Sequence, residues 1–289
     1  MCIPALRRWA QFFRDPHVVG PWQAAPPQPP GSQPAAPANS TSSAAEDPSR
    51  PSLRFVGDST AVLHLPDFQW QYKPAIDSII AASRGKLLST PYLIVDVRGN
   101  GGGCTCSYAS LTPLLYTNPI RRDGDDVWTS AANVALYRSW LVADGVPEVL
   151  KAHIRSVLPE MEARPNQFVV WARDTVARLD TVYPLPRGVA VLVDRKCASS
   201  CEDFVLEARQ SQKVTVLGAE NTAGMDDYGN VHGMWLPGWR RVQVPTTRSH
   251  RLPDHPIDLL GIVPQIRIPA SEDAVEFARG YLRSSHDQR

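Results

Sequence analysis

A short turn between an apolar run and a helical pattern carries two adjacent serines. Ser199 and Ser200 follow the β-type run 189–193 and precede residues 204–208, whose apolar positions have helical spacing. The first N–H groups of a helix have no intrahelical partner, and the positive end of the helix dipole lies there. Such a turn therefore suits a nucleophilic hydroxyl and the oxyanion that forms on its target. Serine is also a common N-cap residue, which is the more frequent role for this local pattern.

A second stretch, residues 92–103, is an apolar run that ends in a glycine-rich loop. Glycine lets the backbone turn freely and approach a ligand closely. The N–H groups of Gly101 and Gly102 are therefore candidate oxyanion donors opposite the N–H of Ser200, while the plainer interpretation is a flexible turn. A phosphate-binding loop is disfavoured because no Gly-Lys-Ser/Thr follows.

Together, the two stretches resemble the C-terminal-processing (tail-specific) serine peptidases and their relative, the tricorn core protease. That family has a strand ending in Asp-x-Arg-x-Asn-Gly-Gly-Gly and a turn of the form Ala-Ser-x-x-Glu, found here at 96–103 and 198–202. Residues 216–224 are similar to its Val-Val-Gly and Thr-x-Gly segment, and residues 261–264 to its closing Gly-Ile-x-Pro. The four blocks agree in order and rough spacing over about residues 53–269.

A serine hydroxyl is a weak nucleophile and needs a base. The tail-specific branch uses a lysine, but Met225 stands at the matching position, so the resemblance favours the tricorn-like branch with its histidine and acidic residue. On that resemblance His17 is the general base and Asp258 the carboxylate that stabilises it, although Pro16 replaces the serine that usually precedes this histidine. His64, at the end of a predicted strand, is the alternative base; a partly buried histidine with a structural role is its plainer interpretation.

The resemblance implies a serine endopeptidase that hydrolyses peptide bonds through an acyl-enzyme at Ser199, with the Ser200 hydroxyl as the rival nucleophile. It implies a peptide or protein substrate and no cofactor or metal. Two other functions stay open, namely an inactive binding protein with a peptidase fold and an esterase with the same nucleophile. The remaining polar residues of the two blocks are expected to be structural: Asp96, Arg98 and Asn100 as braces of the glycine loop, and Glu202 and Asp203 as first-turn acids favoured by the helix dipole.

Four of the five cysteines flank the two blocks, as Cys104, Cys106, Cys197 and Cys201. If the glycine loop meets the serine turn, a disulfide between the two pairs is conceivable, but free buried thiols are the plainer expectation in a chain of this length. A zinc site is disfavoured because the C-x-C and C-x3-C spacings are poor for zinc.

The net charge of +1 argues against a nucleic-acid partner, which usually leaves a basic footprint. No run approaches 18 apolar residues, so no membrane span is expected. The first eight residues do not form the apolar region of a signal peptide, although relatives in the resembled family are often exported, as periplasmic or secreted proteins. The oligomeric state is left open.

Three segments are expected along the chain. Residues 1–23 would be the remnant of an N-terminal helical region, 24–52 a disordered linker rich in Pro, Ala and Ser, and 53–289 the peptidase core. Mixed strands and helices indicate an α/β fold, and the resemblance implies a crotonase-like (ClpP/crotonase) core of repeated strand-strand-helix units. Periodicity predicts strands at 61–65 and 213–217, helices at 77–82, 108–116, 133–141, 148–162 and 274–282, and a hairpin within 231–248.

Overall fold

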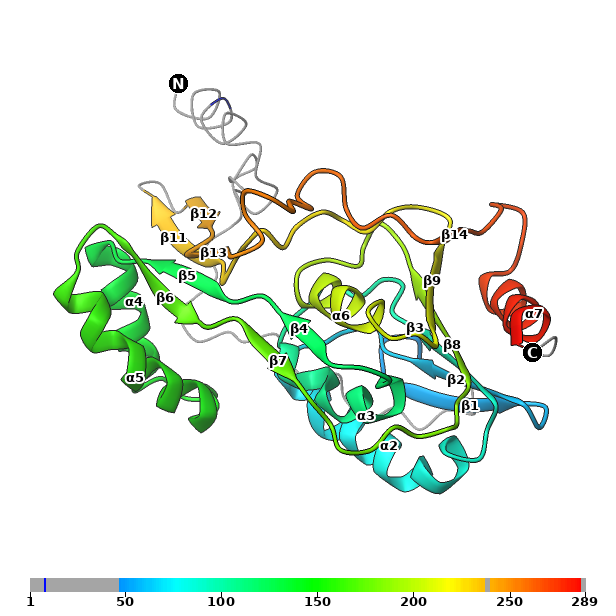
Figure 1. The fold of residues 1–289 in the computed structure, drawn as a ribbon. Helices are drawn as coiled ribbons and strands as arrows, with labels where there is room; N and C mark the ends of the chain where they lie inside the picture. The colour runs from blue at the N-terminus through cyan, green and yellow to red at the C-terminus, as the bar shows by residue number, and fades with distance from the viewer. Residues whose placement is uncertain (1–7, 9–46, 237–239, 287–289) are drawn as a thin grey trace.

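A six-stranded mixed sheet forms the centre of the fold in this computed structural model (Figure 1). The structure describes residue 8, residues 47–236 and residues 240–286. β1 is antiparallel to β2, and every other neighbouring pair is parallel. In spatial order the strands are β1 (Ser52–Val56), β2 (Thr60–His64), β3 (Tyr92–Asp96), β8 (Gly188–Val193), β9 (Val214–Gly218) and β14 (Ile266–Arg267).

Helices cover both faces of this sheet, which explains why β3 and β8 are apolar at nearly every position. Successive side chains of a strand point to opposite faces, so Leu93 and Val95 join one core and Ile94 joins the other. The first core contains residues of α2 (Lys73–Leu87) and α6 (Ser200–Ala208). The second is covered by α7 (Ala274–His286), which lies on the opposite side of the sheet in Figure 1.

The segment after the glycine loop is not the single α-helix predicted at 108–116. It forms a 3₁₀ helix, η2 (Thr105–Leu111), followed by one short turn of α-helix, α3 (Thr112–Leu115). Pro113 lies in the first turn of α3, where its missing N–H is tolerated. Inside a longer helix the same proline would remove a hydrogen bond and clash with the preceding turn.

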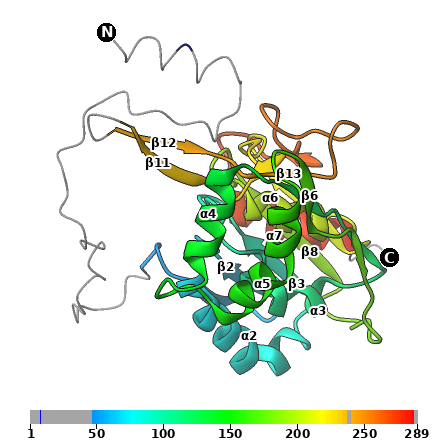
Figure 2. The same ribbon diagram turned by 90° about the vertical axis from the view of Figure 1, so that its left-hand side faces the viewer.

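An insertion between α3 and β8 builds a second, smaller body beside the main sheet (Figures 1 and 2). Its core contains Val127, Tyr137, Ile154 and Trp171. A four-stranded sheet runs in the order β10, β13, β5, β6. The insertion comprises β4 (Ile120–Arg122), β5 (Asp125–Trp128), α4 (Ala131–Trp140), α5 (Glu148–Ala163), β6 (Phe168–Ala172) and β7 (Thr175–Ala177).

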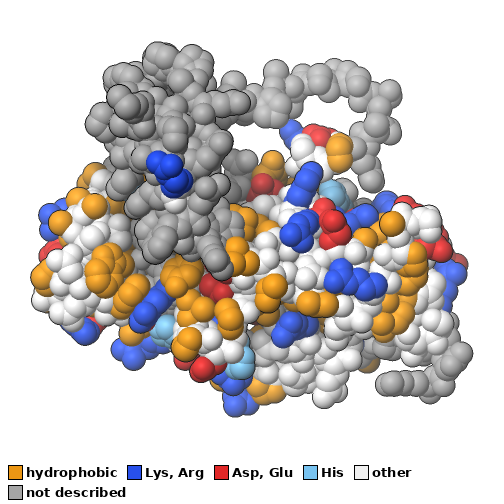
Figure 3. All heavy atoms as spheres, turned by 90° about the horizontal axis from the view of Figure 1, so that it is seen from above, with side chains coloured by type: hydrophobic (Ala, Val, Ile, Leu, Met, Phe, Trp, Pro, Cys, Tyr) orange, Lys and Arg blue, Asp and Glu red, His pale blue; other side chains and the backbone are white. Residues whose placement is uncertain are grey.

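Residues after β9 complete this second body. β10 (Tyr228–Gly229) and β13 (Thr247–Ser249) add to the sheet of the insertion, and β11 (His232–Leu236) pairs with β12 (Arg240–Val244) as the predicted hairpin. The short 3₁₀ turn η1 (Trp70–Tyr72) precedes α2. On the face seen in Figure 3, basic, acidic and apolar side chains are interspersed.

The predicted α/β class is confirmed, and so are the predicted strands and the helices other than that at 108–116. Within the described residues, no helix has the length and apolar character needed to cross a bilayer. The predicted three-segment division stays a prediction. Its N-terminal segment, apart from residue 8, and most of its linker lie outside the described residues, as does His17.

Candidate active site

Ser199 lies on a tight turn between the end of β8 and the start of α6, where it is the N-cap residue. Its backbone has φ 54° and ψ −129°. This backbone conformation is unfavourable for any residue with a side chain, and it persists only when the surrounding structure enforces it. An ordinary N-cap residue has extended backbone instead. Ser199 therefore has a strained turn of the kind found at functional sites, in addition to the capping position expected from the local pattern.

The glycine loop packs directly against this turn. A side chain at Gly102 would place its Cβ 2.6 Å from the Ala198 carbonyl oxygen and 2.9 Å from Ser199 Cβ, so the close approach requires glycine. The Ala198 N–H donates to the Asn100 carbonyl at 3.1 Å. The Ser200 hydroxyl donates to the Gly103 carbonyl at 3.1 Å, and Ser200 is 7% exposed. The glycine loop and the serine turn, the two blocks that carry the family resemblance, are thus in contact.

The N–H groups predicted to line an oxyanion hole differ in their surroundings. The Gly102 N–H donates to Asn100 Oδ1 at 2.9 Å. Gly101 is exposed, and Ser200 is the first residue of α6, where backbone N–H groups lack intrahelical acceptors. The roles of Gly101, Gly102 and Ser200 as oxyanion donors stay predictions.

Three polar side chains hold the glycine loop, as predicted. Arg98 makes a bidentate ion pair with Asp96, with Nε and Nη2 at 2.8 and 2.7 Å from the carboxylate. Asn100 is fully buried and donates through Nδ2 to the Leu65 carbonyl at 2.9 Å. Asp194 adds a brace that was not expected from the sequence, because its Oδ1 accepts from the Gly99 N–H at 3.0 Å.

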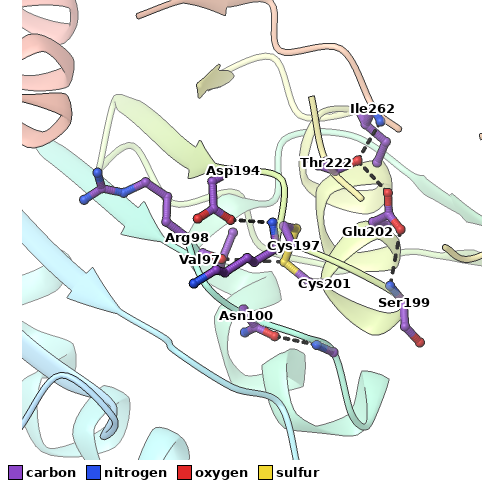
Figure 4. The surroundings of a disulfide bond; sticks show 12 residues. Val97, Arg98, Asn100, Asp194, Cys197, Ser199, Cys201, Glu202, Thr222 and Ile262 are labelled. Atoms are coloured by element: carbon purple, nitrogen blue, oxygen red, sulfur yellow. Dashed lines mark hydrogen bonds between the residues drawn. A yellow bond between two sulfur atoms is a disulfide. The ribbon is translucent and has the colours of Figure 1, made fainter. Parts of the chain in front are cut away.

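Glu202 does more than fill the first-turn role expected from the sequence. Its side chain is fully buried, and its carboxylate accepts four hydrogen bonds, of which Figure 4 shows those from Ser199 and Thr222. The donors are the N–H groups of Ser199, Gly224 and Met225, at 3.3, 2.8 and 2.8 Å, and the Thr222 hydroxyl at 2.5 Å. Glu202 therefore ties the nucleophile turn to residues 222–225. The serine–x–x–glutamate spacing of a capping box was the available signal.

Burial raises the pKa of Glu202 above its ordinary value, against the four hydrogen bonds, which lower it. These two opposing influences on the pKa both come from the buried position of the carboxylate. It is out of water, which disfavours its charge, but surrounded only by donors, which favour that charge.

Asp258 lies in the connection between β13 and β14 and is hydrogen bonded to residues of an earlier connection, the one between β9 and β10. Its Oδ1 accepts from the N–H groups of Asp226 and Asp227, both at 2.8 Å. In return, Asp227 Oδ2 accepts from the N–H groups of Ile257 and Asp258 at 2.8 Å. No hydrogen bond joins Asp258 to Ser199 among the described residues; the two are linked through residues 225 and 226 and Glu202.

His64, the alternative base, lies at the end of β2 with its ring directed at two other groups. Its Nε2 is 3.1 Å from the Pro48 carbonyl oxygen, and its Nδ1 is 4.0 Å from the Asp96 carboxylate. Within the described residues no hydrogen bond connects His64 to Ser199. His17, the preferred base, lies outside the described residues.

The cysteines do not remain free thiols as expected, nor do they pair between the two blocks. Cys104 bonds to Cys106, and Cys197 bonds to Cys201. The Cα atoms of the two pairs are 5.1 and 5.3 Å apart, within the range that a disulfide spans. Four cysteines allow three pairings, and only the local geometry of the loop and of the helix turn selects this one.

A cavity of about 810 Å³ lies between the insertion and α6. Its lining includes Asp203 on α6, Asp125 on β5 and Arg251. Burial and then the charge of Asp203 raise the pKa of Asp125 to about 7. Ser199 is not among the lining residues, so the cavity lies beside the nucleophile turn and not at it. No group of three or more His, Cys, Asp or Glu side chains in the described part of the chain is arranged to hold a metal.

The comparison with known proteins agrees with this fold. A family model, Peptidase family S41, matches residues 59–268. The chain belongs to this family, which confirms the resemblance inferred from the four sequence blocks. The family is one of serine peptidases, a class of hydrolases. A search of curated proteins found no match.

Solved structures with the same fold are distant in sequence. Mature CPAF complexed with lactacystin is 17% identical, with a TM-score of 0.56, over 83% of this chain and 54% of that one. A putative peptidase from Parabacteroides merdae is 20% identical, with a TM-score of 0.54, over 83% of this chain and 66% of that one. The chain thus spans between half and two thirds of the length of these structures, and the likeness concerns the fold.

Proposed function

We propose that this chain is a serine endopeptidase that hydrolyses peptide bonds through an acyl-enzyme at Ser199. The observation that carries the proposal is the strained backbone of Ser199 in contact with the glycine loop. A strand-to-helix turn of this kind exposes a hydroxyl beside free backbone N–H groups, which is the arrangement that acyl transfer requires. The partner is a peptide or protein substrate.

The proposed roles follow from the chemistry of acyl transfer. Ser199 attacks the scissile carbonyl, and N–H groups of Ser200 and of Gly101 or Gly102 stabilise the oxyanion, each donor lowering the barrier by about 3 kcal/mol. His17 takes the serine proton and returns it to the leaving amine. Asp258 stabilises the charge on that histidine. The main sheet with its flanking helices supports a crotonase-like core of strand-strand-helix units.

Covalent labelling tests the nucleophile, because a fluorophosphonate probe reacts only with an activated serine. We expect the wild type and Ser200→Ala to be labelled and Ser199→Ala not to be. Peptide hydrolysis by Ser199→Ala should fall by about 10⁴-fold or more, as for other catalytic serines. Ser200→Ala is the matched control, because it removes the rival hydroxyl and one hydrogen bond to the Gly103 carbonyl. Equal labelling of wild type and Ser199→Ala would contradict the proposal.

The same assay separates the two candidate bases. His17→Ala should lose about 10³-fold in hydrolysis, while His64→Ala should keep most of it, because the His64 ring is directed at Pro48 and Asp96. Loss of activity in His64→Ala alone would assign the base to His64. A wild type that binds peptides but neither reacts with the probe nor cleaves any peptide of a broad library would favour the inactive binding protein.

A further inference from the structure

The Cys197–Cys201 disulfide spans the candidate nucleophile, because Ser199 is midway between the two cysteines in the sequence. Figure 4 shows the disulfide and Ser199 on the same turn. Both cysteines are fully buried. The first ends the connection from β8, and the second lies in the first turn of α6. The covalent link therefore closes the turn on which Ser199 lies.

The two ends of this turn are held by the rest of the protein in different ways. The Cys197 carbonyl accepts from the Ala223 N–H at 2.9 Å, and the Cys197 N–H donates to the Asp194 carbonyl at 3.1 Å. Cys201 belongs to α6, and its N–H donates to the Ala198 carbonyl, within the turn itself, at 3.1 Å. The disulfide is the covalent connection that keeps the first turn of α6 in register with the anchored residue 197.

Ser199 needs such a restraint. Its φ of 54° and ψ of −129° are unfavourable for any residue with a side chain, so the turn relaxes towards extended backbone unless the structure prevents it. Relaxation would rotate both the Ser199 hydroxyl and the Ser200 N–H. Noncovalent contacts to Glu202 and Gly102 also hold the turn, but the disulfide is the restraint that a change of redox state removes.

We propose that the Cys197–Cys201 disulfide is a positioning element for Ser199, so that reducing it lowers the reactivity of the nucleophile. The inference rests on the proposed function of Ser199. In the reduction, a thiolate of a dithiol reductant attacks one sulfur, the S–S bond breaks and a mixed disulfide forms. The second thiolate of the reductant then resolves it. Two cysteine thiols result, and the reductant becomes a cyclic disulfide, with two electrons transferred.

The second disulfide provides an internal comparison. Cys104 and Cys106 are partly exposed, follow the glycine loop and do not span Ser199. A soluble reductant reaches them without opening the core, whereas Cys197 and Cys201 react only after local opening. Reduction should therefore proceed in two stages, with the reactivity of Ser199 lost in the second.

The test compares two double variants. We expect Cys197→Ala/Cys201→Ala to lower the rate of fluorophosphonate labelling and kcat for a peptide by about 10-fold or more, with KM unchanged, a loss that corresponds to a barrier about 1.4 kcal/mol higher. Cys104→Ala/Cys106→Ala should stay within about 2-fold of the wild type. Circular dichroism checks folding, and Cys197→Ser/Cys201→Ser replaces the alanine variant if that variant does not fold.

A titration with dithiothreitol, with each disulfide quantified by mass spectrometry, should show activity falling with the reduction of Cys197–Cys201. A folded Cys197→Ala/Cys201→Ala variant that reacts at the wild-type rate would overturn the inference, as would activity that falls with reduction of Cys104–Cys106. If the wild type neither reacts nor cleaves, the proposed function has failed. Hydrogen exchange of residues 197–203 then decides the positioning role, since exchange as slow in the variant as in the wild type refutes it.

Discussion

At the scale of single residues, the site depends on a buried carboxylate as much as on the serine. Ser199 supplies the hydroxyl, but its backbone has a conformation that it would not adopt alone. Glu202 accepts hydrogen bonds from the nucleophile turn and from residues 222–225, and all four groups around its carboxylate are donors. A neutral amide at this position must direct an NH₂ group at two of those donors.

Glu202→Gln should therefore be destabilising despite its matched size. We expect the free energy of unfolding to fall by about 2–3 kcal/mol, because hydrogen bonds to a charged group are replaced by opposed donors. Hydrolysis should fall as well, since the Ser199 N–H loses its acceptor. Urea denaturation measures the first effect and a peptide assay the second.

Glu220→Gln is the control for this change, because Glu220 is an exposed glutamate in the segment just before Thr222. Its unfolding free energy should stay within about 0.5 kcal/mol of the wild type. Equal stabilities of Glu202→Gln and Glu220→Gln would show that the four hydrogen bonds contribute little.

At the scale of secondary-structure elements, a histidine joins two segments of the insertion. His250 follows β13, and its Nδ1 and Nε2 lie 2.7 Å from Asp174 and 3.1 Å from Asp126. Asp126 belongs to β5 and also pairs with Arg248, while Asp174 lies between β6 and β7. Burial lowers the pKa of His250, but the hydrogen bonds to Asp174 and Asp126 outweigh this and leave the pKa above its ordinary value.

The stabilisation from His250 should consequently depend on pH. A raised folded-state pKa means that the stabilisation is complete below the unfolded value of 6.5 and is lost as the pH rises through the folded value. We expect His250→Gln to lower the unfolding free energy by about 1 kcal/mol at pH 5.5 and by clearly less at pH 8.5. Thermal denaturation at the two pH values measures this.

His255→Gln serves as the comparison, because His255 is an exposed histidine five residues further along the same connection. It should change stability little at either pH. If His250→Gln lowers the unfolding free energy as much at pH 8.5 as at pH 5.5, then His250 stabilises the protein by packing alone.

At the scale of the whole molecule, the sequence predicted those parts of the site that consist of a few consecutive residues. The glycine loop and the Ala-Ser-x-x-Glu turn each occupy a few consecutive residues, so their meeting could be predicted from the family resemblance. The burial of Glu202 could not be, because its partners Thr222, Gly224 and Met225 lie some twenty residues away and meet it only in the folded chain. The cysteine pairing was also beyond reach, since it depends on backbone turns and not on spacing.

An acidic cluster lies beside the cavity, where the main sheet and the insertion meet. Arg251 contacts Asp226 at 2.7 Å, Asp203 at 3.5 Å and Asp227 at 3.6 Å. One cation therefore faces three carboxylates. Asp125 lines the same cavity, and burial together with the charge of Asp203 raises its pKa to about 7.

This raised pKa makes the folded protein less stable as the pH rises. Between the ordinary value of 3.8 and about 7, the folded state holds a proton on Asp125 that the unfolded state has released, so the unfolding free energy falls across that window. Asp125→Asn cannot ionise. We expect it to match the wild type near pH 4 and to be more stable on the order of 3 kcal/mol at pH 8, because one pKa unit corresponds to about 1.4 kcal/mol. Urea denaturation across this range measures the difference.

Asp123→Asn is the matched control, since Asp123 lines the same cavity two residues away but is exposed. Its stability relative to the wild type should be the same at pH 4 and pH 8. If the stability that Asp125→Asn gains over the wild type does not grow with pH, the Asp125 carboxylate must contact water or a cation in solution. The acidic cluster would then be a hydrated surface of the cavity, and its charge would not oppose folding at neutral pH.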